Sequence, residues 1–176
     1  MATIDLIVLG ILKKESLSAY DIQKLVEYRN ISKWVKISTP SIYKKVIQLE
    51  EKGYIRSSIV KEGKMAEKAV YSLTDSGEEA FESLMMEIAA KPIHILLDFN
   101  AVIVNLSSLS PDYQKACLSN IEKNVNALKS YIEENICMKE KRTDIPETGM
   151  AVLKQQFILA EAIETWINSL KDTFER

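Results

Sequence analysis

A short helical segment followed by a hairpin constrains the fold of this chain more than any other feature. Residues 40–52 carry apolar side chains at helical spacing, and the segment stops at Gly53, a residue favoured just beyond the C-terminus of a helix. Two runs of alternating apolar and polar residues follow, at 54–60 and 69–73, on either side of a turn that contains Gly63. Such runs around a glycine-containing turn predict a β-hairpin.

Two further helices are predicted before this helix and its hairpin. Apolar residues within 4–12 follow helical spacing. A second helix is expected to begin after Ser18, a hydroxyl N-cap, with Asp21 as its capping-box partner. Hydroxyls followed by proline, at 38–40, predict the start of the third helix. Because three helices followed by a hairpin is the order of a winged helix-turn-helix, we assign residues 1–76 to such a domain.

The second half of the chain predicts only helices. One opens at Thr74, and others are expected over 93–106, from Pro111 to about residue 141, and over 149–174. The expected fold class is therefore mainly α with a small β-hairpin wing. We assign residues 77–176 to a helical dimerisation domain.

Two of these helices carry more apolar surface than a solvated helix needs. The long helix has five apolar residues at the alternating three-and-four spacing of a packing seam, which can face its own chain or a partner. The last helix is apolar along two sides, and a helix packed only on its own fold needs one, so we assign the other to a homodimer interface. The seam consists of Leu118, Ile121, Val125, Leu128 and Ile132. The side assigned to the homodimer consists of Val152, Leu159, Ile163, Trp166 and Leu170.

Charge is distributed unevenly between the two halves. The chain has a net charge of −2, but residues 1–76 contain 13 Lys and Arg against 9 Asp and Glu, whereas residues 77–176 contain 10 against 16. A positive half in an acidic protein suggests that this half meets a polyanion. Chance segregation is the alternative.

The third predicted helix has an apolar stripe and a polar face. Ile42, Val46 and Leu49 fall in one sector and are expected to point inward. The opposite face offers amines for phosphates, and Ser41 and Gln48 for base edges, including a bidentate contact to adenine. An ordinary solvated helix face is the alternative. The residues of the polar face and its margin are Ser41, Lys44, Lys45, Gln48 and Lys52.

The predicted wing adds positive charge beside this face. Lys61, Lys64 and Lys68 flank the tip of the hairpin, where contact with the DNA backbone or the minor groove is expected. Tyr43 lies at the edge of the helix face, within reach of a phosphate. Double-stranded DNA is therefore the expected partner. The alternative is a winged-helix protein-interaction module without sequence-specific DNA binding, because the net charge is acidic and fold does not dictate function.

Residues 4–80 contain an ordered set of short motifs: LGIL with AYDI, then W and S before SIYKKVIQLEEKGYI, then YSLTDSG. In this order the motifs resemble the PadR family of bacterial transcriptional regulators, with its "LGLL…GYxI" opening, its "W…S.gsxYpxLxxLExxGlI" segment and its "YxLTxxG" exit from the wing. The matching residues are Leu9, Gly10, Tyr20, Ile22, Trp34, Ser38, Ser41, Tyr43, Leu49, Glu50, Gly53, Ile55, Tyr71, Leu73, Thr74 and Gly77.

The resemblance implies a homodimeric regulator, with a repressor that binds an inverted-repeat operator as the leading hypothesis. A cytoplasmic location is expected from the sequence, which shows neither a signal peptide nor a membrane-spanning run. The resemblance also implies that particular residues of the winged helix-turn-helix contact DNA. For Tyr20, as for Trp34, the alternative is an aromatic ring that fills the core. The sequence departs from the family pattern at Ser18-Ala19, at Lys44 and in a wing without an arginine-rich tip, so the operator sequence does not carry over. The implied contacts are Ser38, Ser41, Tyr43 and Lys44, with Tyr20 and Lys36 as further ones.

The sequence gives little support to enzymatic, metal or membrane functions. His94 is the only histidine and has no nucleophile motif nearby, and there is no phosphate-binding glycine motif or metal-ligand cluster. We therefore expect no enzyme activity and no cofactor. Cys117 and Cys137 fit reduced structural thiols. The apolar run at 93–106 is too short and too polar to span a bilayer, and the N-terminus lacks a basic stretch and a cleavage site.

A small-molecule effector is a further possible partner. The resemblance allows a response to small aromatic or cationic compounds, which would bind among apolar side chains between the two halves. An ordinary packed core is the alternative reading of these side chains. The candidates are Met85, Met86, Phe99, Phe157, Trp166 and Phe174.

Overall fold

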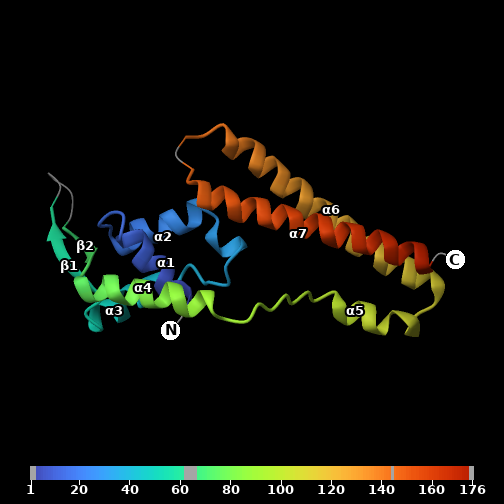
Figure 1. Cartoon of the computed structure of the whole chain (residues 1–176), viewed down its shortest axis with the longest axis horizontal. Helices are drawn as coiled ribbons and strands as arrows, with labels where there is room; N and C mark the ends of the chain where they lie inside the picture. The colour runs from blue at the N-terminus through green and yellow to red at the C-terminus, as the bar shows by residue number, and fades with distance from the viewer. Residues whose placement is uncertain (1–2, 62–66, 144, 175–176) are drawn as a thin grey trace. The chain divides into compact units, whose positions relative to one another are not determined.

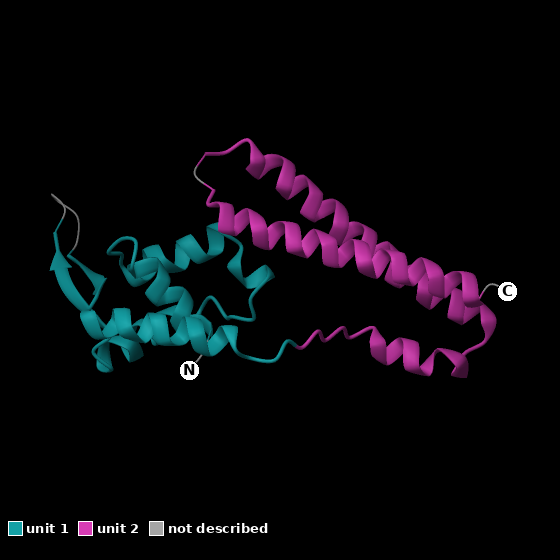
Figure 2. Cartoon of the chain, viewed as in Figure 1, with its two compact units in different colours: residues 1–93 teal, residues 94–176 magenta. Residues whose placement is uncertain are grey.

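The computed structural model describes residues 3–61, 67–143 and 145–174. These residues form a mainly helical protein with one antiparallel hairpin (Figure 1). The chain divides into two compact units, residues 1–93 and 94–176 (Figure 2).

The first unit has the order of elements that the sequence predicts, which confirms the winged helix-turn-helix. Our sequence-based domain boundary, after residue 76, falls within the first turn of the unit's last helix. The unit continues through that helix to residue 93. Its elements are α1 (Thr3–Leu12), α2 (Ala19–Tyr28), the short 3-10 helix η1 (Ile31–Lys33), α3 (Ser41–Glu51), β1 (Ile55–Val60), β2 (Lys68–Leu73) and α4 (Asp75–Ala89).

Hydroxyl caps begin α2 and α4, as expected from the sequence. The Ser18 hydroxyl accepts a hydrogen bond from the Asp21 amide at 3.2 Å and donates to the Asp21 carboxylate at 2.6 Å. The bond from Ser18 is the main reason that the pKa of Asp21 is lowered, with the charge of Lys68 contributing less. Thr74 caps α4 in the same way, because its hydroxyl accepts from the Gly77 amide at 3.1 Å.

The start of α3 differs from the prediction. The residue at its N-cap is Pro40, and no side chain caps the helix there. The amides of Ser41 and Ile42 instead donate to the main-chain carbonyls of Ser38 and Thr39, at 3.0 and 3.1 Å. A backbone turn satisfies these donors, so the hydroxyls of residues 38 and 39 do not have to.

The core of the first unit joins α1, α2, α3 and α4 beneath the hairpin. Leu17 extends the hairpin by an isolated antiparallel bridge to Tyr71, with N···O distances of 3.2 and 2.9 Å. The loop before α2 is therefore fixed to the wing. Fully buried apolar side chains in this core include Val8, Leu9, Ile22, Ile42, Val46, Leu49 and Leu84.

The end of α3, the start of the wing and the start of α4 meet at one point. Gly53 has a φ of +74°, the left-handed conformation that ends α3 without strain only for glycine. The hydroxyls of Thr74 and Ser76 both donate to the Gly53 carbonyl, at 2.7 and 3.0 Å. Gly77 lies so close to the carbonyl of Tyr54 that a Cβ atom would overlap that oxygen. These contacts are the physical reason that the sequence has glycine at both 53 and 77.

The second unit is built on two long antiparallel helices (Figure 1). The packing seam of the long helix faces the last helix of the same chain, where Leu118, Ile121 and Val125 form a core with Ile167. This settles the alternative that the sequence left open, except at Leu128, which is exposed. The unit contains α5 (Asn100–Asn105), the short 3-10 helix η2 (Leu106–Ser108), α6 (Pro111–Glu140) and α7 (Glu147–Phe174).

Charged pairs tie α6 to α7 along their length. Lys171 donates to Glu122 at 2.7 Å, and Lys129 donates to Glu164 at 2.6 Å. The bond to Glu164 is the main reason that the pKa of Lys129 is raised. These contacts fix the antiparallel register that the apolar seam alone would allow to slide.

The prediction of a helix over 93–106 was wrong for the first half of that range. Helix α5 begins only at Asn100, and the side chains of Ile93 and Leu96 are 90% and 87% exposed. Because these side chains are exposed, no burial offsets the cost of starting a helix here. Among the described helices, none combines the length and the apolar character needed to cross a membrane.

Candidate nucleic-acid interface

Helix α3 presents its polar face outward from a fully buried stripe. Ile42, Val46 and Leu49 are completely buried, as their spacing predicts. Ser41 and Lys44 are exposed on the other side. Tyr43 is exposed at the edge, and Gln48 is half-buried. This face offers a hydroxyl, an amine, a phenol and an amide to a partner, and these groups suit both phosphate and base-edge contacts.

Lys45 is placed differently from the other residues predicted to contact DNA. Its amine lies 2.8 Å from a carboxylate oxygen of Asp5 in α1, and the side chains of Lys45 and Asp5 are 17% and 1% exposed. The approach lacks hydrogen-bond alignment, so the contact is an ion pair. The amine of Lys45 therefore points into the unit and away from the exposed face. Sequence reasoning missed Asp5, although a carboxylate in an otherwise apolar helix signals a buried partner.

The segment before α3 and the start of α2 add exposed groups. Lys36 and Ser38 are both exposed. Tyr20 is 57% exposed, so its ring does not fill the core. The amine of Lys24 lies 5.6 Å from the centre of this ring. Trp34 is also partly exposed, at 38%.

The wing carries two described lysines, and Lys64 lies outside the described residues. Lys61 lies 3.8 Å from Glu67, and Lys68 lies 3.8 Å from Asp21. Exposed pairs at such distances contribute little to stability, so these amines can exchange their carboxylates for phosphates at small cost.

A second residue that sequence reasoning did not assign to the site is Glu50. Its carboxylate accepts a hydrogen bond of 2.9 Å from the Ser57 amide, which ties α3 to β1. Burial raises the pKa of the nearby Tyr71, and the charge of Glu50 adds to this effect. The orientation of the wing relative to α3 therefore depends on a side chain of α3 itself.

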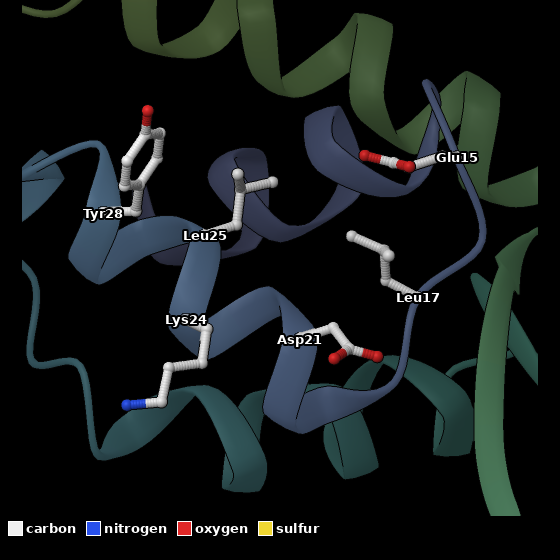
Figure 3. Close-up of a pocket in the computed structure, with 6 residues that line it drawn as sticks. All are labelled: Glu15, Leu17, Asp21, Lys24, Leu25 and Tyr28. Atoms are coloured by element: carbon white, nitrogen blue, oxygen red, sulfur yellow. The ribbon is translucent and has the colours of Figure 1, made fainter.

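Two open hollows lie on the surface of the described part of the chain. One of about 290 Å³ lies beside α2, between Glu15, Leu17 and Tyr28 (Figure 3). The other, of about 460 Å³, lies where α6 and α7 meet, near Arg142 and Met150. Charged side chains line both hollows, and none of the residues suggested for an effector lines either one.

The aromatic and methionine residues suggested for an effector are distributed over both units. Phe99 stacks on Trp166 with ring centres 5.8 Å apart, within the second unit. Met85 and Met86 are exposed on α4. His94 is exposed in the non-helical segment before α5. Within the described residues, no group of three or more metal-binding side chains is present.

The residues assigned to a homodimer interface divide into two groups. Ile163 and Leu170 pack against the core of their own unit, and Val152 is half-buried. Leu159 and Trp166 remain 38% and 39% exposed. Of the residues assigned to the interface, these last two are the exposed ones in the single chain.

The fold is that of several solved bacterial regulators. Bacillus subtilis PadR in complex with operator DNA is 22% identical, with 98% of this chain and 99% of that chain covered and a TM-score of 0.83. The same protein in complex with p-coumaric acid is 22% identical, with 99% and 100% covered and a TM-score of 0.79. The Vibrio cholerae virulence activator AphA is 16% identical, with 98% of each chain covered and a TM-score of 0.71. At these identities the similarity establishes the fold.

Comparison with protein families identifies the kind of domain that the first unit forms. None of the curated proteins compared with this chain matches it. Residues 8–83 match the transcriptional regulator PadR-like family, whose members regulate transcription and are not enzymes. The matched region contains α3, the hairpin and the junction between Gly53 and Gly77. The chain therefore contains a domain of the transcriptional regulator PadR-like family, and it folds as a winged helix-turn-helix followed by a helical unit.

Proposed function

We propose that this protein is a homodimeric repressor that binds an inverted-repeat DNA operator through α3 and the wing. The observation that carries this proposal is the exposed polar face of α3 on a PadR-like winged helix. The fold of B. subtilis PadR in complex with operator DNA supports it. Repression, as opposed to activation, is part of the proposal, since the V. cholerae protein of the same fold is an activator.

The proposed contacts separate into two kinds. Lys44 neutralises phosphate, while Ser41 and Gln48 read base edges in the major groove. The remaining groups position the protein on the backbone, and Lys45 is left out because Asp5 holds its amine. These positioning groups are Tyr20, Lys36, Ser38, Tyr43, Lys61, Lys64 and Lys68.

Replacing Gln48 by alanine is expected to weaken operator binding by about 1–3 kcal/mol and binding to random DNA very little. Lys44→Ala is expected to weaken both alike and to make the log-log salt dependence shallower by about one unit. Fluorescence anisotropy with a duplex selected by the protein and with a scrambled duplex measures both quantities. Lys115→Ala, at an exposed position of α6, is the control. Equal losses for Gln48→Ala on both duplexes would contradict its role in base reading.

A homodimer places two α3 helices about 34–36 Å apart on one face of DNA, which explains an inverted-repeat operator. Two-fold symmetry is the commonest closed arrangement of protein subunits. On the side of α7 that the sequence assigns to the interface, Leu159 and Trp166 are the residues that stay exposed in the single chain, so we propose them for it.

The double variant Leu159→Ala with Trp166→Ala is expected to weaken the dimer at least about 30-fold, because buried aromatic anchors at interfaces are worth about 2 kcal/mol or more each. Light scattering across a concentration series measures the change. Ile158→Ala, another exposed residue of the same helix, is the control. Wild-type protein that is monomeric at micromolar concentration would end the dimer proposal.

A small aromatic acid is the effector class that we propose. The support is the fold of B. subtilis PadR in complex with p-coumaric acid. An effector shifts operator affinity only if it binds the free and DNA-bound conformations with different affinity. We expect at least one phenolic acid to weaken operator binding about 5- to 150-fold, the usual range of allosteric coupling. Unchanged operator affinity across a panel of phenolic acids and aromatic cations would count against this.

A further inference from the structure

A buried carboxylate in α1 faces the helix that we propose reads DNA. Asp5 is 1% exposed, and within the described residues its charge partner is Lys45 of α3, at 2.8 Å. Neither residue takes part in the proposed DNA contacts. Buried pairs of this kind often add little net stability, because desolvation offsets their attraction. The pair therefore calls for an explanation other than stability.

The position of Lys45 around α3 suggests what the pair does. At about 100° per residue, Lys45 lies about 60° to one side of Ile42, at the margin between the buried stripe and the exposed face. Glu50, which accepts from the Ser57 amide, lies about 80° to the other side. Two polar contacts therefore hold α3 on opposite margins of its apolar stripe.

The contacts on these two margins control the rotation of α3 about its own axis. The stripe of Ile42, Val46 and Leu49 is buried by the hydrophobic effect, which has no direction of its own. Functional side chains must be held within about 0.5 Å and 10–20° of their working geometry. A rotation of α3 larger than that tolerance would move the groups of the exposed face away from the bases that they read.

We propose that Asp5 and Lys45 are positioning residues that fix the rotation of α3 and thereby the selectivity of DNA reading. The inference rests on the proposed DNA-binding function and adds to it two residues that do not touch DNA. Lys45 acts through its ion pair with Asp5. Asp5 lies in α1 and so is not part of the face of α3 that is proposed to read DNA.

The test is a double-mutant cycle with Asp5→Asn, Lys45→Met and their combination. Affinity is measured for a duplex selected by the wild-type protein and for a scrambled duplex, over a salt series. Each single variant is expected to lower affinity for the selected duplex about 5- to 150-fold, the effect of losing one base contact, with little change on scrambled DNA. The double variant is expected to lose no more than either single variant, because the pair acts as one unit.

Other roles for Lys45 give different results. If its amine binds phosphate directly, Lys45→Met weakens both duplexes alike and makes the salt dependence shallower by about one unit, while Asp5→Asn does not. If the pair only stabilises the fold, the ratio of the two affinities stays at its wild-type value while thermal stability falls. Either result would overturn the proposal.

Controls separate folding and function. Lys13→Met breaks an exposed pair with Glu78 in the same unit and is expected to leave the affinity ratio unchanged. Circular dichroism establishes which variants are folded at the assay temperature. If a single variant does not fold, the double variant decides, because it has no unpaired buried charge. A wild-type ratio of the affinities for the selected and the scrambled duplex in the double variant would overturn the proposal. A wild-type protein without selectivity would instead overturn the proposed function itself.

Discussion

Replacing Gly77 by alanine is expected to destabilise the first unit by about 3 kcal/mol or more, at the top of the usual range for overpacking. A Cβ atom here would overlap the main-chain carbonyl of Tyr54, and its next neighbours include the side chain of Leu73. A backbone oxygen cannot move aside as a flexible side chain can. Relief requires α4 to separate from the start of the wing, which would break the hydroxyl contacts to Gly53.

The measurement is urea unfolding followed by tryptophan fluorescence. Because the chain has two units, a single transition need not describe it, so we use a Trp166→Phe background in which Trp34 reports on the first unit. Gly149→Ala is the matched control, since its Cβ would have only an ordinary contact of 3.9 Å with Ile145. That control is expected to leave the Trp34 transition at its reference position, because Gly149 lies in the second unit. A Gly77→Ala protein with an unshifted Trp34 transition would show that the junction is not tight.

Local patterns were enough to predict most of the fold. The hydroxyl caps at Ser18 and Thr74 were both predictable, because an N-cap depends on residues three positions apart. The hairpin followed from alternation and a glycine turn, and its register pairs Ile55 with Leu73. The prediction failed at 93–99 because the outcome there depends on packing and not on a local pattern. Apolar residues there have helical composition but no surface to pack on, which the sequence does not reveal.

The candidate site was less predictable, because it depends on tertiary contacts. Spacing alone placed Lys44 and Lys45 together on or near one polar face. Only the position of α1 shows that Lys45 turns toward Asp5 while Lys44 stays exposed. The same limit affects α7, where two apolar sides were visible in the sequence. That Ile163 and Leu170 pack on their own unit, whereas Trp166 stays partly exposed, required the placement of α6.

Replacing Ile167 by alanine is expected to destabilise the helical unit by about 2–5 kcal/mol. Ile167 is fully buried in the cluster that also contains Leu118 and Val125, and truncation leaves a cavity between two helices held in fixed register. Asn168→Ala, at the adjacent exposed position, is the matched control and is expected to change stability by less than about 0.5 kcal/mol.

The same variant connects the core of the helical unit to the proposed dimer. Ile167 contacts its own chain, whereas Leu159 and Trp166 are the exposed residues of α7 proposed to meet a partner. If loss of the core loosens α7, the dimer should dissociate at higher protein concentration in Ile167→Ala although no interface atom has changed. Trp166 fluorescence in a Trp34→Phe background follows unfolding of the unit, and light scattering follows dissociation. An Ile167→Ala protein that unfolds at lower urea but keeps the wild-type dissociation constant would mean that the dimer is held by elements other than α7.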